Sequence, residues 1–352
     1  MKRPLLATVA TLVAALTATV GLVAIGSASQ ASQKPSQPRA TTKLTFGYVS
    51  PGPDTWYARD VQGFEYAAKL YGVKVDVLNS EYDQQKELAN IESFVAKGVN
   101  GISMFSYDDT GADETAVLAG QAHIPVVLTD NVHNAISNGY KVAASVDFDW
   151  CGMGKDYANY MAKEWPGQNY AMLAGNFLAP PTVVLDSCMQ SQAKKLGKNK
   201  LVYFQQTMYD TETAVNLSED LIASGTKFGI LFVMNDDMGA AVSQVLKSHG
   251  LLKKVHLMTE NGSNVGLALM KQGKLAYTIS SSPAWEGMVA FLELYAAAQH
   301  RLSATADKEV LLPAIPVTRS VALNPMKVVS WTPGPVDWTL TKDYLPGLVV
   351  KA

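Results

Sequence analysis

Polar and aromatic side chains follow two apolar segments of this chain at the points where those segments stop. Residues 43–49 lead into Asp54, Trp56 and Tyr57, and residues 101–104 lead into Phe105 and a polar run. In an open parallel sheet, ligands bind at the carboxyl ends of the strands. These side chains therefore predict a binding site.

Asp130 ends a third apolar segment. A carboxylate at the end of a buried strand is costly without partners, and it can accept two hydrogen bonds from the hydroxyl groups of a ligand. Asp is also common in turns and at helix N-caps, so a purely structural role stays open. The same alternative applies to Asn235, which precedes a helix, and to Asn261, which precedes Gly262.

Alternating strands and helices must position these residues. Between residues 43 and 130 short apolar segments alternate with amphipathic helices, and two of these helices, residues 61–71 and 87–97, end at a glycine. After Asp147 the same alternation begins again. Short strands joined by helices of this length imply right-handed crossovers and parallel sheets. The sequence predicts an α/β fold with two doubly wound parallel-sheet lobes.

The length of the chain and its charge exclude some classes of partner and function. The chain has 352 residues, more than one ordinary core holds, and its formal net charge is −2 with acids and bases interspersed. We therefore expect no nucleic-acid partner. We expect no metal and no cofactor either, because no histidine pair has metal-ligand spacing and no glycine-rich phosphate loop follows a strand.

The first 42 residues have the composition of an export signal and a leader. Lys2 and Arg3 precede an almost unbroken apolar run, and small residues follow at 26–28. This predicts a cleaved signal peptide over residues 1–28, with a retained membrane anchor as the alternative. Residues 29–42, rich in Ser, Gln, Pro and Ala, predict a flexible leader. No cysteine stands at the junction, so we do not expect a lipoprotein.

The chain has two cysteines, Cys151 and Cys188. An exported chain meets an oxidising compartment, where such a pair can form a disulfide. Free cysteine is also a common small buried residue, and a sequence does not give the distance between two thiols. Both interpretations stay open.

Catalysis and gene regulation find little support in the sequence. There is no Gly-x-Ser-x-Gly motif, and the five histidines are scattered through helix ends and loops. A sugar-responsive repressor would need a DNA-reading helix-turn-helix where this chain has an export pattern. We expect a binding protein and not an enzyme, with a secreted hydrolase as the weaker alternative.

Over residues 43–317 the chain resembles the periplasmic sugar-binding proteins of ABC importers, of the ribose-binding type (type I periplasmic binding proteins). The order and spacing of short motifs carry the resemblance, and no single motif does so alone. These motifs are Trp56-Tyr57, Gln62-Gly63-Phe64, Leu128-Thr129-Asp130, Val146-Asp147, Asn235-Asp236, Glu260-Asn261-Gly262 and Ser282-Pro283.

The resemblance implies two lobes joined by three crossovers, close to Val146, Ser281 and Ile315, that close on a ligand like jaws. The first lobe would hold residues 43–145 and 282–314. The second would hold residues 146–281 and 315–352, including a tail that is longer than the family pattern requires.

The resemblance also implies which residues line a site between the lobes. Aromatic rings suit the C–H faces of a sugar, and planar polar groups suit its hydroxyls. The implied ligand-binding residues are Asp54, Trp56, Tyr57, Phe105, Asp130, Asn131, Asp147, Tyr209, Asn235, Asn261 and Ser281. Ordinary core packing is the alternative for each ring.

The chain departs from the family pattern inside this predicted site. The family usually has arginine directly after the Asp130 position and at the start of the helix that holds Cys188, where this chain has Asn131 and the region of Asp186. Three further changes replace an asparagine, an aspartate and a glutamine by Phe105, Asn261 and Ser281. A guanidinium would add charge-assisted hydrogen bonds of roughly 1.5–3 kcal/mol each. The pocket should therefore be less cationic than one made for ribose, and an ordinary pentose is not the expected ligand.

The expected function is capture of a sugar or polyol in an interlobe cleft and delivery to the membrane permease of an ABC importer. The chain is expected to act as a monomer in the periplasm or another extracytoplasmic space. A cationic amine is the alternative ligand, because Asp54, Asp130, Asp147 and Asp149 near aromatic rings suit an ammonium group. A ligand sensor for a membrane receptor is a further alternative.

Overall fold

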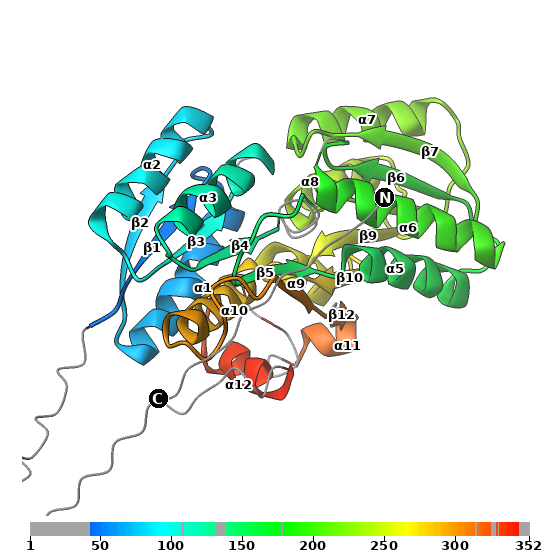
Figure 1. The fold of residues 1–352 in the computed structure, drawn as a ribbon. Coiled ribbons are helices and arrows are strands. Elements are labelled where there is room, and N and C mark those ends of the chain that lie inside the picture. Colours follow the sequence, from blue (N-terminus) through cyan, green and yellow to red (C-terminus); the bar gives the residue numbers. More distant parts are fainter. Residues whose placement is uncertain are drawn as a thin grey trace, which may run out of the picture. The chain divides into compact units, whose positions relative to one another are not determined.

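The fold is taken from a computed structural model that describes residues 43–344, apart from residues 107–108, 131–137, 178, 314, 325–328 and 330. The predicted signal peptide, the leader and Asn131 lie outside the described residues. The described chain forms two six-stranded sheets with helices between the strands (Figure 1). The predicted two-lobed, doubly wound α/β fold is confirmed.

The first sheet has the strand order β11-β5-β4-β3-β1-β2, and its paired strands are parallel. The elements of this lobe are β1 (Thr45–Ser50), α1 (Thr55–Tyr71), β2 (Lys74–Asn79), α2 (Gln84–Lys97), β3 (Gly101–Phe105), α3 (Asp109–Gln121), β4 (Val126–Thr129), β5 (Ala144–Phe148), α10 (Pro283–Ala298) and β11 (Lys308–Leu312).

The second sheet has the order β12-β10-β9-β8-β6-β7, and β12 runs antiparallel to β10. Its elements are α5 (Trp150–Glu164), β6 (Tyr170–Ala174), α6 (Pro180–Leu196), β7 (Leu201–Gln206), α7 (Thr211–Ala223), β8 (Ile230–Val233), α8 (Asp236–Ser248), β9 (His256–Asn261), α9 (Asn264–Lys271), β10 (Tyr277–Ser280) and β12 (Ile315–Val317), followed by α11 (Arg319–Ala322).

The chain passes between the sheets three times, after β5, after β10 and after β11. The expected lobe boundary at residue 146 divides β5, which belongs whole to the first sheet. Helix α10 returns to the first lobe, where it packs on α1 and on β3, β4 and β5. Segments far apart in the sequence therefore meet around β4 and β5.

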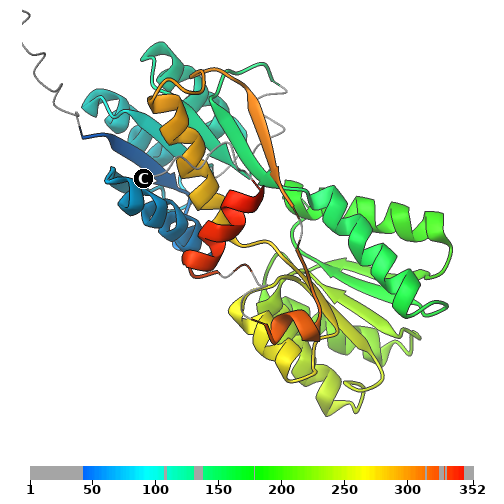
Figure 2. The ribbon, with the colours of Figure 1, turned by 90° about the horizontal axis from the view of Figure 1, so that it is seen from below.

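Alternate residues of the first sheet face opposite layers of helices. On β1, the Tyr48 ring lies 5.2 Å from the ring of Phe64 on α1, between ring centroids, whereas Val49 packs in a cluster with Ile91 and Phe94 of α2. A strand covered by helices on both faces requires this alternation. Helices α1 and α10 form one layer, and α2 and α3 form the other (Figure 2).

Helices α1 and α10 approach each other closely because each has a glycine at the contact. A Cβ atom on Gly63 would lie 1.9 Å from the carbonyl oxygen of Ala284, and one on Gly287 would lie 2.0 Å from the carbonyl oxygen of Asp60. Any larger residue would push the helices apart. The contact therefore fixes the first turns of α10, including Glu286, against the first sheet.

The tail corrects one expectation, because its helix α12 (Pro335–Tyr344) packs on the first lobe and not on the second. The Trp338 ring lies 6.1 Å from the ring of Tyr71 on α1, between centroids, and the Trp285 indole N–H donates to Thr341 Oγ1 at 2.9 Å. Trp285 is fully buried on α10. Its N–H needs an acceptor, and the tail supplies one.

No helix within the described residues combines the length and the apolar composition needed to cross a bilayer. A disulfide joins Cys151 on α5 to Cys188 on α6, with the two Cα atoms 5.2 Å apart. Cys188 lies in the middle of α6, because this helix begins earlier than its apolar pattern predicts, at Pro180.

The disulfide yields a prediction for stability. It closes a loop with a sequence separation of 37 residues, and such a cross-link restricts the unfolded chain by roughly 3–4 kcal/mol in the loop-entropy description. We expect the Cys151→Ala/Cys188→Ala variant to have a free energy of unfolding lower by about that amount, measured by denaturant unfolding. Equal stability of the variant and the oxidised protein would contradict this account.

Candidate functional site

Two of the predicted site residues lie on neighbouring strands of the first sheet. Asp130 directly follows β4, and Asp147 lies in β5, which pairs with β4. The Asp130 backbone N–H donates to the carbonyl of Val146 at 3.1 Å, although Asp130 has a φ of 54°. The hydrogen-bond ladder between β4 and β5 therefore continues to Asp130. The left-handed backbone of Asp130 then turns the chain away at the carboxyl end of the strand.

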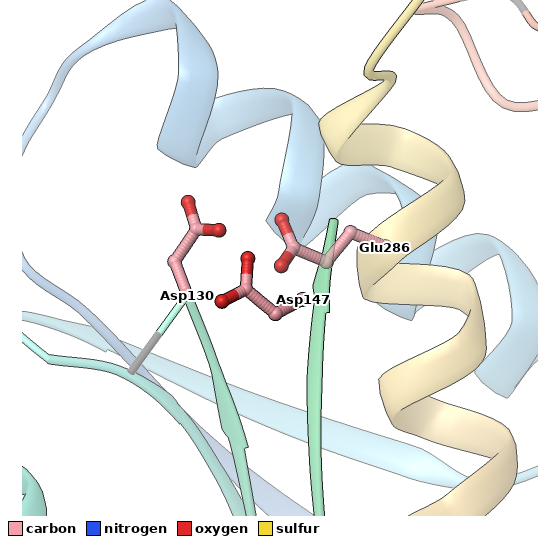
Figure 3. A group of neighbouring side chains, drawn as sticks. All are labelled: Asp130, Asp147 and Glu286. Carbon is pink, nitrogen blue, oxygen red and sulfur yellow. The ribbon is translucent and has the colours of Figure 1, made fainter. Parts of the chain in front are cut away.

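A third carboxylate, Glu286 of α10, joins these two. One oxygen from each of Asp130, Asp147 and Glu286 lies within 4.8 Å of the others, and Figure 3 shows the three side chains converging from β4, β5 and α10. Their residues are 8%, 4% and 0% exposed, respectively. We call these three residues the carboxylate triad.

The hydrogen bonds of the triad are unevenly distributed. Asp147 Oδ1 accepts from the backbone N–H of Phe148 and from the indole N–H of Trp150, both at 2.6 Å. Among the described residues, no partner donates to Asp130 Oδ1 or to either carboxylate oxygen of Glu286. Three buried acceptors therefore have no donor among the described residues.

Burial dominates the protonation of these groups. It raises the pKa of Asp130 well above its ordinary value, and the charges of Asp147, Asp60 and Glu260 raise it further. Burial likewise raises the pKa of Glu286, with added contributions from Asp130 and Asp60. Burial raises the pKa of Asp60 itself to about 7. Burial and the neighbouring acids therefore favour the protonated forms of these groups, and a nearby cation would favour the ionised forms.

The second lobe contributes a further buried carboxylate, Glu260 of β9. Burial raises its pKa well above the ordinary value, and the Ser281 hydroxyl donates to it. The Asn261 amide also donates to Glu260 in the orientation that satisfies both groups. Because Glu260 raises the pKa of Asp130, acids from both lobes act on one another across the site.

Aromatic rings border the carboxylates. The Trp56 ring contacts those of Phe148, Trp150 and Trp331 with centroid distances of 6.2, 6.4 and 5.4 Å. The Trp150 indole is also the donor to Asp147. The Trp56 indole nitrogen itself is buried and has no partner among the described residues. This group forms one apolar wall with a free N–H donor.

A second aromatic pair lies at the end of β3. The Tyr57 ring lies 4.7 Å from that of Phe105 and 6.3 Å from that of Tyr82, between centroids. Burial raises the pKa of Tyr57, and the charges of Asp54 and Asp130 raise it further. This pair therefore lies close to the triad.

The remaining predicted residues lie on loops and helix ends. Tyr209 follows β7; its hydroxyl lies 2.6 Å from Thr182 Oγ1, and the charges of Glu260 and Asp130 raise its pKa together with burial. Asp54 caps α1 by accepting from the Trp56 N–H at 2.7 Å, and Asn235 caps α8 by accepting from the Met238 N–H at 2.9 Å. The capping role left open for Asn235 is therefore present, and Asp54 plays one as well.

Four predicted site residues share an unusual backbone conformation. The φ angles are 54° for Asp130, 58° for Tyr209, 119° for Asn235 and 106° for Asn261. Such angles cost roughly 1–3 kcal/mol each for residues other than glycine, and they gather at functional sites. Strain at the ends of β4, β7, β8 and β9 therefore marks the same region as the carboxylates.

The structure thus brings together Trp56, Tyr57, Phe105, Asp130, Asp147, Tyr209, Asn261 and Ser281, and it places Asp54 and Asn235 at helix starts. Sequence reasoning missed Glu286, Glu260 as an acid of the site, Trp150 and Trp331. The sequence did contain a feature that could have identified Glu286, because an acidic residue is unusual on a strongly apolar helix. No sequence feature identified Trp331, since it lies in the tail, beyond the strand and helix pattern.

Two surface pockets lie elsewhere. One is lined by Asn100 and Pro125 and the other by Asn169 and Lys200, and neither contains a predicted site residue. Those residues precede strands, so both pockets lie at the amino ends, where ligands of open α/β sheets do not bind.

The triad is also the group within the described residues whose geometry could hold a metal ion. Calcium takes about six to eight oxygen ligands. One oxygen of Asp147 already accepts two N–H bonds. The three carboxylates alone therefore do not complete a calcium site.

Comparisons with known proteins identify the family of the chain. A family model described as a periplasmic binding protein domain matches residues 46–302. The fructose import binding protein of Bifidobacterium longum is 29% identical over 286 residues, covering 77% of this chain and 83% of that one. The ribose import binding protein of Haemophilus influenzae is 26% identical over 222 residues, covering 63% and 74%.

A solved structure supports the fold. The ABC transporter periplasmic solute-binding protein of Actinobacillus succinogenes, crystallised with bound D-allose, has a TM-score of 0.72 at 19% identity, covering 80% of this chain and 99% of that one. At this identity the match shows the fold alone.

The buried acids predict how stability depends on pH. Burial raises the pKa of Asp60, Asp186 and Asp236 to about 7 in the folded state, whereas an unfolded aspartate titrates near about 4. Each group contributes stability that is fully present below the unfolded pKa and is lost as the pH rises through the folded pKa, by about 1.4 kcal/mol per pH unit within that window. We expect the ligand-free protein to melt at a higher temperature at pH 5 than at pH 8.

Asp186 provides the matched variant, because neither of its carboxylate oxygens has a partner among the described residues. Asp186→Asn should flatten the pH dependence, and Asp220→Asn, at an exposed position, should leave it unchanged. A melting temperature that rises from pH 5 to pH 8 would show that these acids are ionised in the folded protein.

Proposed function

The chain belongs to the periplasmic binding protein family, and from this premise we propose that it is an extracytoplasmic solute-binding protein of an ABC importer. It captures a sugar or polyol between its two lobes and delivers it to the membrane permease. The family match over residues 46–302 and the import binding proteins among its relatives support this role. They are binding proteins, so the chain is not an enzyme.

One observation carries the proposal: residues of both lobes act on one another at the carboxyl ends of their strands. The charge of Glu260 in the second lobe raises the pKa of Asp130 in the first, and the charges of both residues raise the pKa of Tyr209. Ligands of open α/β sheets bind at these strand ends. A small solute placed there contacts both lobes at once.

The side chains suit a polyhydroxylated ligand. Asp130 and Glu286 offer acceptors that have no donor in the described part of the chain, and sugar hydroxyls can donate to them. The wall formed by Trp56, Trp150 and Trp331 suits the C–H face of a sugar ring. The buried Trp56 N–H offers a donor to a ligand oxygen.

Ligand binding drives the lobes together only through contacts that the closed form makes and the open form lacks. The three crossovers are the points about which the lobes turn. The closed form then presents the surface that the permease recognises. We also propose that the chain is exported by a cleaved signal peptide, is not a lipoprotein and acts as a monomer.

A thermal-shift screen tests the proposed function. Purified protein is melted with sugars, polyols and, as a separate class, amines without hydroxyl groups. A ligand at about 100 times its dissociation constant adds about 2.7 kcal/mol to the free energy of unfolding, a rise of several degrees in Tm. We expect a sugar or polyol, substituted or not, to raise Tm and to be recovered unchanged. Stabilisation by simple amines alone, or conversion of the ligand, would refute the proposal.

A substitution of Trp331, in the C-terminal tail, tests whether this residue belongs to the ligand site. Its ring packs on Trp56 of the first lobe, and its indole N–H donates to the Asn261 carbonyl of the second at 3.2 Å. We expect Trp331→Ala to weaken binding of the sugar found in the screen by roughly tenfold or more, since a buried aromatic wall and an interlobe bond are lost. Titration calorimetry measures the affinity.

Trp338→Ala is the matched control. Trp338 packs on Tyr71, away from the triad, so its removal should lower Tm and leave the affinity within about threefold. If both variants bind equally well, Trp331 does not belong to the site.

A further inference from the structure

We propose that the ligand carries a protonated amine and that Asp130, Asp147 and Glu286 hold this ammonium group. The inference rests on the proposed capture of a sugar or polyol. It names the class within it: an amino sugar or an amino polyol.

The first support is an excess of acceptors. Asp130 Oδ1 and both carboxylate oxygens of Glu286 are buried without a donor among the described residues. Glu286 is fully buried and Asp130 is 8% exposed. Ionised carboxylates can only accept hydrogen bonds, and a buried acceptor without a donor is costly. The missing partner of the triad is therefore a group rich in donors.

The second support is an absence of positive charge. The groups that shift the pKa values of Asp130, Glu286 and Glu260 are acids, hydroxyls and amides, and no described lysine, arginine or histidine is among them. None of the ion pairs among the described residues involves Asp130 or Glu286. Buried charges in proteins are normally paired. Among the described residues, acids and no cation surround Asp130 and Glu286, and a bound cation would compensate them.

The third support is the aromatic surface beside the triad. The Trp150 indole binds Asp147 directly, and its ring belongs to the same wall as those of Trp56 and Phe148. Carboxylates bordered by tryptophan rings attract a cation by charge and through the π face. A doubly charged metal ion gains little from such a wall, and the triad alone does not complete its oxygen shell.

The donor count favours an ammonium group over a hydroxyl. A hydroxyl brings one donor and two lone pairs into the site, and these lone pairs face further carboxylate oxygens. An ammonium group brings three donors and no lone pair. Three converging carboxylates therefore match an ammonium group in both charge and donor number.

The decisive experiment compares matched ligands on the wild-type protein. Each hexose or cyclitol is titrated beside the compound in which one hydroxyl is replaced by an amine, and beside the N-acetylated form of that amine, which is neutral. We expect the best amine to bind at least roughly tenfold more tightly than its hydroxyl parent and its N-acetyl form, because the ammonium group adds a positive charge and further donors for the carboxylates.

Proton release gives a second readout on the same samples. Burial raises the pKa of Asp130 and of Glu286 and so favours their protonated forms, whereas a nearby cation favours the ionised form. Calorimetry in two buffers of different ionisation enthalpy should show protons released on binding of the amine and none on binding of the parent sugar. Binding of the amine without proton release would count against contact with the triad.

Glu286→Gln and Glu293→Gln form a matched pair on α10. Glu293 is also fully buried, but it pairs with Lys308 Nζ at 2.5 Å. We expect Glu286→Gln to abolish the preference for the amine over its parent sugar, whatever loss of affinity the two ligands share. Glu293→Gln should keep the preference.

The outcomes separate this inference from the proposed function. If neutral sugars bind as tightly as their amines, the inference is wrong and sugar capture stands. If simple amines bind and no sugar or polyol derivative does, the proposed function is wrong. If calcium or manganese chloride alone raises Tm and Glu286→Gln removes that rise, the triad is a metal site and the inference is overturned.

Discussion

The structure depends on one electrostatic constraint, the burial of carboxyl groups that have no cation beside them in the described chain. Asp130, Asp147 and Glu286 meet within 4.8 Å, and Asp60 and Glu260 act on the same group. Without a ligand, such groups must either hold protons or bear the cost of burial. Without a ligand, these buried acids therefore make the folded protein less stable than apolar residues at the same positions would. A ligand that compensates the acids removes this cost, and the free energy recovered adds to its affinity.

Close helix packing forces the acids together. Gly63 and Gly287 let α1 and α10 approach to a distance that no side chain allows, so the first turn of α10 faces the ends of β4 and β5. The ladder between these strands brings Asp130 and Asp147 to the same edge. Neither helix could retreat to relieve the repulsion without opening the core around Phe64 and Phe291, whose rings lie 5.4 Å apart between centroids.

Sequence reasoning found what local pattern determines. The strand ends predicted Asp130, and the apolar periodicity predicted both sheets, because each signal lies within a few residues of the element that it describes. Sequence reasoning did not predict Glu286 or Trp331 as site residues. The place of Glu286 depends on which helix returns to the first lobe, and that of Trp331 depends on where the tail lies. The disulfide also needed a distance between two helices. Asp54 and Asn235 occupy strand ends as predicted, yet their side chains cap the following helices.

The tail links the lobes at the site itself, which makes it more than an appendage. It leaves the second lobe after α11, places Trp331 in contact with both Trp56 and Asn261, and packs on the first lobe at α12. Movement of one lobe against the other would change the contact of Trp331 with Trp56 or its bond to Asn261. Trp331 also completes the aromatic wall. The same side chain would therefore contact the ligand and change its contacts when the lobes move. Ligand contacts and closure are therefore coupled through a residue outside the three crossovers.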